Sequence, residues 1–452
     1  MIWLQKFLIL VLNPFARLSS KIDNRIKEKL RICVLVAICL LPYIWYTGTC
    51  VGLIVTQLVK MLLAIALIII YLFLCLDQPL HIVDWRKWII ALWFAFGTVI
   101  FVMGFISKQN PGYWMSGPVF AIGFPAVYFV LLQTDYYKKH LQYMAKIVLI
   151  ISAIYFVITA VAAPTISPAA WIGGRYNGIA FDCNRVAEFG IIALCCGLYI
   201  VFDESSKFWR ALSAIVIGIS VGMIILTQSR TAFFAIILIA LFWAIVLMWN
   251  REKPGKKAFA LFLIAVAFAG ATYGLIQAQH KSEIVESNPG VAVEDIDEGD
   301  ILDRVGVESS AGNLDSYSSG RLRIWGNYAS HFNLTGNERV NDTEPIDEED
   351  RIINAHNNTV EFTYRSGILA GLLYVIIQLC MLVFGVKTAF TKGASRRACF
   401  AVSVLIGFGI FSNLMPSYNP FCNAIFFFAL MTQIPIFEKK DKNEKKEAEG
   451  RC

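Results

Sequence analysis

The chain has 452 residues, of which 57% are hydrophobic and only 16% are charged, and its formal net charge is +7. A soluble globular protein has about 45–50% apolar and about 25% charged residues, so the composition excludes that class. The apolar residues come in blocks, and a bilayer core requires roughly 20 of them per helix. The sequence therefore predicts an all-α polytopic membrane protein. We assign its positive charge to membrane topology and expect no nucleic-acid partner.

The apolar blocks predict twelve transmembrane helices. Residues 1–31 are expected to form an interfacial N-terminal segment, because the first apolar stretch ends at Asn13-Pro14 and shows no small-residue cleavage site. Residues 32–277 hold nine predicted spans and residues 359–437 hold three. The spans are 32–47, 53–76, 87–107, 115–133, 146–164, 186–202, 210–227, 231–249, 257–277, 363–386, 398–415 and 420–437.

Lysine and arginine near the span ends set the expected orientation, because cytoplasmic loops retain them. Seven alternate segments, beginning with the N-terminal one, hold 28 of the 40 Lys and Arg residues. Both termini are therefore expected in the cytoplasm, together with the charged tail 438–452. This places a multi-pass protein in the plasma membrane, with the segment 278–358 outside.

The segment 278–358 is too long for a simple connector between two helices. Its acidic stretch, 283–315, is expected to lack regular structure. Its later part, RLRIWGNYASHFNLTG, has helical spacing with Leu322, Trp325 and Tyr328 on one side. The sequence thus predicts a large extracytoplasmic loop containing an amphipathic helix on the outer membrane face.

Polar groups gather on the predicted outer side, close to the membrane. Arg175 lies in GGRYNGIAFDCNR, Arg230 in TQSRTAFF, Arg321 and Arg323 in GRLRIW, and His356 closes the large loop. An arginine at a span end often extends to lipid phosphates instead of serving a reaction. Arg230, however, interrupts a long apolar sequence, where a charge is costly and usually functional.

The segment AHNNTVEFTYRSG has a structural interpretation beside a functional one. His356 with Asn357 could cap the following helix, but Asn357 or Asn358 would cap it without the imidazole. Glu361 and Arg365 are four residues apart, so we expect them to pair along that helix.

Together these groups fit glycosyl transfer from a lipid-linked diphosphate. Arginine forks bind phosphate oxygens bidentately and stay charged. A histidine titrates near neutral pH and can accept a proton from an attacking hydroxyl. An acceptor hydroxyl could then attack the anomeric carbon while the diphosphate leaves, with no nucleotide required.

The segments TQSRTAFF, SGRLRIWGNYASHF and AHNNTVEFTYRSG, in this order and topology, resemble the O-antigen ligase and O-antigen polymerase family of integral membrane glycosyltransferases. The resemblance implies a GT-C-like fold and an undecaprenyl-diphosphate-linked glycan donor. It also implies a saccharide acceptor and chemistry at the outer face without metal or cofactor. Other polysaccharide-assembly proteins are further expected partners.

The resemblance also assigns roles to single residues. His356 would activate the acceptor hydroxyl, and Arg230 and Arg321 would bind the donor diphosphate. The accessory candidates are Arg175, Asn184, Arg323, Asn357 and Glu361. Two departures stand out, because Cys183 replaces a frequent proline, and Ala370 replaces the glycine, threonine or tyrosine usual in ligases.

Several alternatives stay open. The acceptor is a lipid-core sugar in a ligase and another carrier-linked repeat in a polymerase, and Ala370 leads us to favour polymerase slightly. A polysaccharide transporter or flippase is the main rival. Such proteins usually bury carboxylates near mid-membrane, whereas Lys60 and Glu188 lie near the outer ends of their predicted spans. A scaffold for envelope assembly is the third possibility.

Overall fold

The computed structural model describes residues 2–47, 57–109, 111–134, 136–166, 170–172, 174–180, 182–250, 256–287, 321–337, 355–391, 396–414 and 423–437. Most of the acidic stretch 283–315 and the whole charged tail 438–452 lie outside these residues. The chain forms two compact units. Unit 1 comprises residues 1–41, 56–144 and 321–452, and unit 2 comprises 42–55 and 145–320.

The described residues confirm an all-α polytopic fold. Nine of their helices are long and apolar enough to cross a membrane. Three predicted spans are shorter or interrupted instead. Residues 53–76 correspond to α3 (Gln57–Cys75), 115–133 to a chain of short helices, and 420–437 to two helices separated at Gln433.

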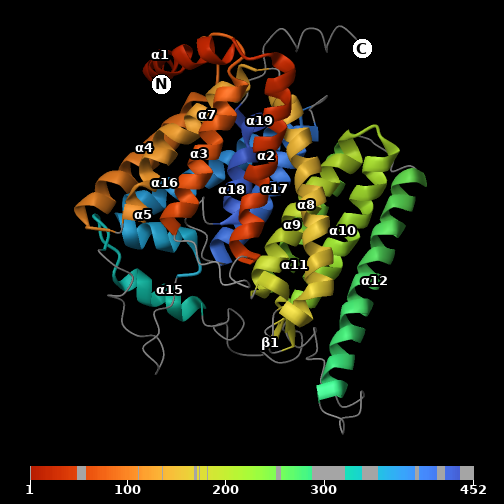
Figure 1. Ribbon diagram of the computed structural model, residues 1–452. Coiled ribbons are helices and arrows are strands. Elements are labelled where there is room, and N and C mark those ends of the chain that lie inside the picture. Colours follow the sequence, from red (N-terminus) through yellow and green to blue (C-terminus); the bar gives the residue numbers. More distant parts are fainter. Residues whose placement is uncertain are drawn as a thin grey trace. The chain divides into compact units, whose positions relative to one another are not determined.

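Unit 1 contains the first and last helices of the chain (Figure 1). Its elements are α1 (Ile2–Ser19), most of α2 (Asn24–Thr47), α3, α4 (Lys87–Ile106), α5 (Pro111–Trp114), α6 (Ser116–Pro118), the π-helix η2 (Val119–Gly123), α7 (Phe124–Leu132), the start of α8 (Tyr136–Ile166), α15 (Arg321–Ser330), α16 (Asn358–Ala389), α17 (Arg396–Leu414), α18 (Ala424–Thr432) and α19 (Ile434–Phe437).

The π-helix η2 interrupts the predicted fourth span. Pro125 follows it and has no N–H to donate, and its ring crowds the carbonyl four residues earlier, that of Ala121. A π turn widens the helix at this carbonyl, so the chain passes the proline without ending the span.

An aromatic core in unit 1 packs η2 against its neighbours. The Trp93 and Phe120 rings stack with centroids 5.6 Å apart, and Phe120 stacks on Phe426 at 6.0 Å. Phe362 from the first turns of α16 meets Phe96 of α4 edge to face at 5.0 Å. Such pairs each contribute about 0.5–1.5 kcal/mol beyond area burial, so the start of α16 is firmly held.

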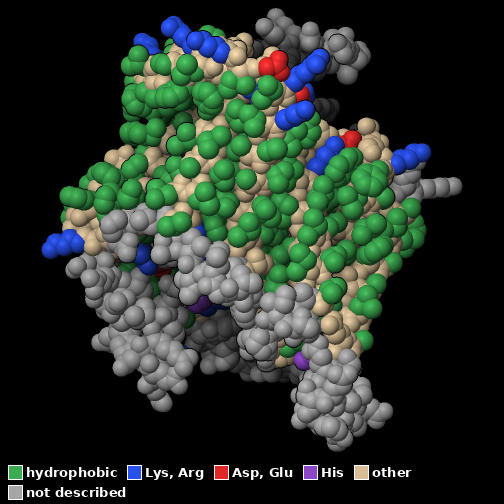
Figure 2. Space-filling view, in the orientation of Figure 1, with side chains coloured by type: hydrophobic (Ala, Val, Ile, Leu, Met, Phe, Trp, Pro, Cys, Tyr) green, Lys and Arg blue, Asp and Glu red, His purple; other side chains and the backbone are tan. Residues whose placement is uncertain are grey.

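α1 continues through Pro14, where the sequence suggested an end. The Gln5 side chain bonds Val83 at both backbone groups, at 2.9 and 3.1 Å, and Asn13 Oδ1 accepts the Leu80 N–H at 2.8 Å. In unit 1, exposed Lys and Arg side chains gather at the end that carries α1 (Figure 2), among them Lys6 and Arg17.

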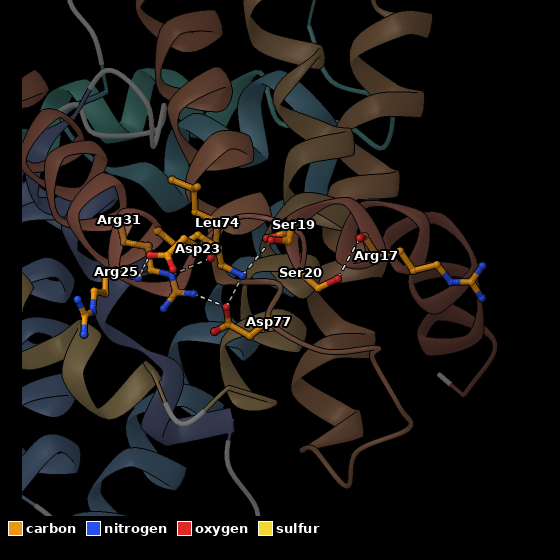
Figure 3. Close-up of polar contacts among 9 residues, drawn as sticks. Arg17, Ser19, Ser20, Asp23, Arg25, Arg31, Leu74 and Asp77 are labelled. Carbon is orange, nitrogen blue, oxygen red and sulfur yellow. Dashed lines mark hydrogen bonds and ion pairs between the residues drawn. The ribbon is translucent and has the colours of Figure 1, made fainter.

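α2 begins at Asn24, eight residues before the predicted first span. Its cationic first turns are stabilised by contacts with the end of α3 (Figure 3). Arg31 Nε donates to the Leu74 carbonyl at 2.7 Å, and its Nη2 bonds Asp77. Lys27 Nζ lies 2.7 Å from the same carboxylate. The arginine therefore satisfies a carbonyl that the end of α3 would otherwise leave unpaired.

Unit 2 contains the rest of α2 and α8, followed by a small hairpin and four long helices. Its further elements are β1 (Trp171–Ile172), β2 (Arg175–Tyr176), the 3-10 helix η3 (Gly178–Ala180), α9 (Cys183–Asp203), α10 (Lys207–Thr227), α11 (Arg230–Trp249) and α12 (Lys256–Ser287). The two strands pair antiparallel, with Trp171 opposite Tyr176. No sequence pattern predicted this hairpin.

Two glycines let α12 approach α10 closely. A Cβ on Gly218 would lie 2.3 Å from the Ala265 carbonyl oxygen, and one on Gly222 would lie 2.8 Å from that of Ala269. Small residues four apart allow such backbone contact between membrane helices. α12 runs on to Ser287, ten residues beyond the predicted span end.

Candidate functional site

Arg230 stands at a tight turn between two membrane helices of unit 2. α10 ends at Thr227, Gln228 adopts a left-handed conformation (φ +48°), and α11 begins at Arg230. The Gln228 amide donates to the Gly174 carbonyl at 3.1 Å, which joins the turn to the hairpin. The arginine therefore sits at the helix N-terminus, where backbone N–H groups also favour an anion.

The two weaker candidates of unit 2 lie against this turn. Arg175 Nε donates to the Thr227 carbonyl at 3.0 Å, and its Nη2 lies 3.4 Å from Asn184 Oδ1. The same oxygen accepts the Ser229 hydroxyl at 3.1 Å. One amide thus joins the hairpin, the start of α9 and the residue before Arg230. The structure brings Arg175, Asn184 and the Arg230 turn together.

Sequence reasoning missed a charged pair one turn further along α9. Arg185 Nη1 lies 2.7 Å from Glu188 Oε2, and the guanidinium stands over the Tyr46 ring at 4.9 Å. Glu188 is fully buried, so the pairing neutralises a carboxylate that would be costly at this depth. The i,i+3 spacing was the available signal.

In unit 1, α15 packs against the segment that carries His356. Ile324 and Tyr328 are buried together with Ala355 and Tyr364, and Trp325 lies against this cluster. Of the three residues that the sequence placed on one side of this helix, Trp325 and Tyr328 contact the cluster, whereas Leu322 is 44% exposed. Ile324 lies about 160° from Leu322 around the helix, and it packs in the cluster together with Tyr328, four residues further on.

Arg321 is the first residue of α15 and is half-buried, whereas Arg323 is exposed. Because α15 is only ten residues long and is held by its packed face, the position of Arg321 follows from that packing. The segment around Arg321 and the segment around His356 therefore pack together in unit 1.

His356 itself has an unusual backbone. Its φ is +51°, in the left-handed region that non-glycine residues rarely adopt. It does not cap the following helix, because the Asn357 side chain accepts the Thr359 and Val360 N–H groups at 2.8 and 3.2 Å. The prediction that an asparagine suffices as the cap is confirmed, and the half-buried imidazole still needs an explanation.

Two glycines interlock the end of the α15 segment with α16. Gly336 and Gly367 have φ values of +86° and +82°. A Cβ on Gly336 would lie 2.1 Å from the Arg365 carbonyl oxygen, and one on Gly367 would lie 2.1 Å from that of Leu334. We call this contact the glycine clasp, and only glycine fits both its conformation and its spacing.

Asparagine amides complete the clasp. The Asn337 N–H and its side-chain Nδ2 both donate to the Tyr364 carbonyl at 2.9 Å. The Ile368 N–H donates to the Asn333 carbonyl at 2.9 Å. Asn333 and Asn337 therefore provide hydrogen-bond partners for the Tyr364 carbonyl and the Ile368 N–H, on either side of the point where α16 breaks.

That break separates α16 into two parts. Gly367 has non-helical dihedral angles, so residues 358–366 form a short helix before the longer membrane helix. The sequence predicted one span starting at 363. In the short helix Glu361 and Arg365 form the expected ion pair, and Arg365 stands over the Tyr113 ring at 5.0 Å.

Buried polar groups hold the short helix against its surroundings. Asn358 is fully buried and its Nδ2 donates to the Tyr374 hydroxyl at 3.2 Å. Thr363 contacts the longer part of α16 at Gly371, where a Cβ would lie 1.8 Å from the threonine hydroxyl oxygen. The helix that follows His356 is thus fixed on several sides.

The structure therefore assigns the candidate residues to two clusters. Arg175, Asn184 and Arg230 belong to unit 2, and Arg321 and His356 belong to unit 1. A set of metal-ligating side chains is not found among the described residues.

A family model described as O-antigen ligase matches residues 214–375 of the chain. The matched segment contains Arg230, Arg321 and His356, and it begins after Arg175 and Asn184. No curated protein matches the chain. The turn before α11, the packed α15 helix and the His356 segment all fall within the match, so residues 214–375 of the chain are similar to the O-antigen ligase family.

Proposed function

We propose that this protein transfers a glycan from an undecaprenyl-diphosphate carrier to a saccharide hydroxyl at the outer face of the membrane. The observation that carries the proposal is the packing of α15, which begins at Arg321, directly against the His356 segment within the family match. A cationic fork and a base on one rigid body suit a reaction that needs both.

In the proposed reaction the histidine acts as the base and the two arginines bind the leaving group. The acceptor hydroxyl oxygen attacks the anomeric carbon, and His356 takes the hydroxyl proton. The bond from the anomeric carbon to the diphosphate breaks, and its electron pair leaves on the carrier diphosphate. Arg230 and Arg321 bind that diphosphate bidentately, so the charge developing on it is compensated.

The identity of the acceptor distinguishes a polymerase from a ligase. A polymerase uses another carrier-linked repeat unit, and a ligase uses a lipid-core sugar. Ala370 is fully buried where the ligase pattern has glycine, threonine or tyrosine, and we favour polymerase for this reason.

Alanine variants of Arg230, Arg321 and His356 test the proposal in cells lacking the native protein. We expect loss of polymer at normal protein level, because removing a base or a charge clamp costs roughly 10²–10⁴-fold in rate. Arg25→Ala is the control, since Arg25 is an exposed arginine on α2.

Intact polymer in all three variants would contradict the proposal and favour a scaffold. Transport of the lipid-linked glycan across vesicles by purified protein, without transfer to an acceptor, would favour the flippase instead.

A further inference from the structure

One hydrogen bond connects the Arg321 helix directly to the peptide that precedes His356. The Trp325 indole Nε1 donates to the Ala355 carbonyl at 2.7 Å. Ala355 is fully buried, so water does not provide this carbonyl with an alternative donor. The contact links residues 30 positions apart.

This hydrogen bond lies directly before a residue with a strained backbone, His356. His356 has a φ of +51°, and such a conformation costs an L-residue free energy unless its surroundings impose it. The Ala355 carbonyl is held on one side of His356, and the Asn357 side chain caps the helix on the other. With the flanking groups fixed, the direction of the Cα–Cβ bond of His356 is fixed as well, and this bond sets where the imidazole can lie.

Trp325 differs in this respect from other buried tryptophans of unit 1. The indole nitrogens of Trp85 and Trp93 are buried and lack a hydrogen-bond partner. A tryptophan that only fills space can therefore be accommodated here without its N–H being used. The 2.7 Å bond of Trp325 is a specific contact.

We propose that Trp325 is a positioning residue, which holds His356 in the orientation needed to accept the proton of the acceptor hydroxyl. The inference rests on the proposed function. Trp325 contacts the backbone before His356, and the proposed reaction assigns the binding of diphosphate to Arg230 and Arg321. Its loss should therefore slow the chemical step and leave donor affinity unchanged.

The test compares Trp325→Phe with the wild type, His356→Ala and Trp85→Phe. Purified proteins in vesicles are given the undecaprenyl-diphosphate-linked glycan with excess enzyme. Because all donor is then bound to folded enzyme, the single-turnover rate constant describes the reaction of bound donor. A fraction of unfolded protein does not lower it. We expect Trp325→Phe to lower this constant about 10- to 100-fold, as a displaced catalytic group does, with the donor Kd unchanged.

Trp85→Phe is the matched control, because it removes the same ring atoms from a buried tryptophan whose N–H makes no hydrogen bond. It should react like the wild type. Should Trp325→Phe fail to fold, β-(3-benzothienyl)alanine at this position keeps the ring shape and replaces the N–H by sulfur, and the same rate loss is expected.

The outcomes separate the inference from the proposed function. A wild-type rate in both position-325 variants, with His356→Ala inactive, would overturn the positioning role alone. Full activity of His356→Ala would overturn the proposed function. A raised donor Kd in Trp325→Phe with an unchanged rate constant would also overturn the inference.

Discussion

Replacing Gly367 by alanine is the sharpest test of the glycine clasp. The added Cβ would lie 2.1 Å from the Leu334 carbonyl oxygen, whereas ordinary contact begins at 3.4 Å. The carbonyl must therefore move away by about 1.3 Å. The positive φ of +82° adds roughly 1–2 kcal/mol of backbone strain for an L-residue.

This displacement falls on the segment that joins α15 to the start of α16. A misplacement of about 1 Å can cost roughly 100-fold in rate, so we expect Gly367→Ala to reduce glycan transfer about 100-fold while the protein still inserts. Transfer is measured as polymer formed per amount of purified protein in vesicles. The amide hydrogen exchange of residues 333–337 and 364–368 reports whether the clasp has opened.

The matched control is Gly409→Ala in α17 of the same unit. A Cβ at Gly409 meets nothing within 4 Å, and alanine favours a helix by about 1 kcal/mol over glycine. It should retain full transfer and unchanged exchange. Wild-type transfer by Gly367→Ala would refute the claim that this glycine sets the position of the His356 segment.

Three further predictions address single side chains. Arg321→Lys should lose most transfer activity because a point charge does not replace a bidentate fork, and near-normal turnover would make charge alone sufficient. Asn184→Ala removes an acceptor of two hydrogen bonds, each contributing about 1 kcal/mol. Donor affinity should therefore fall by up to about 30-fold, and an unchanged Kd would contradict this. The hydrogen bond from Lys146 lowers the pKa of Glu204 below its usual value of 4.5. Its stabilisation is therefore present above that pH and lost as the pH falls through the lowered pKa. At neutral pH the free energy of unfolding of the wild type should exceed that of Glu204→Gln by roughly 1.5–3 kcal/mol. A difference in the free energy of unfolding that does not shrink as the pH is lowered from neutral into the acid range would contradict this cause.

The membrane helices were predictable because their signal is local. Runs of apolar residues predict spans without knowledge of their neighbours, and α4, α9 and α11 agree with the expected ranges to within a few residues. The expected Glu361–Arg365 pair and the Asn357 cap are also local features, since both depend on fixed spacing along one helix.

The failures concern contacts between distant segments. Helical spacing in α15 allowed either Leu322 or Ile324 on the packed side, and only contact with α16 selects the latter. The break at Gly367 depends on the Leu334 carbonyl beside it.

The same difference between local features and contacts of distant segments applies to the candidate site. The sequence predicted Arg230, Arg321 and His356 as site residues from their order and from the cost of charge near the membrane. It did not identify Trp325 as a donor to the Ala355 carbonyl, because that bond spans 30 residues. Nor did it indicate that Asn184 joins Arg175 to the turn before Arg230.

The most direct test of this account is an experimental structure of the protein in a lipid bilayer with the undecaprenyl-diphosphate-linked donor bound. We predict one diphosphate contacted by the guanidinium groups of both Arg230 and Arg321, with the His356 imidazole facing the anomeric carbon. A diphosphate bound without either arginine, or a His356 on the far side of the membrane from it, would contradict the account.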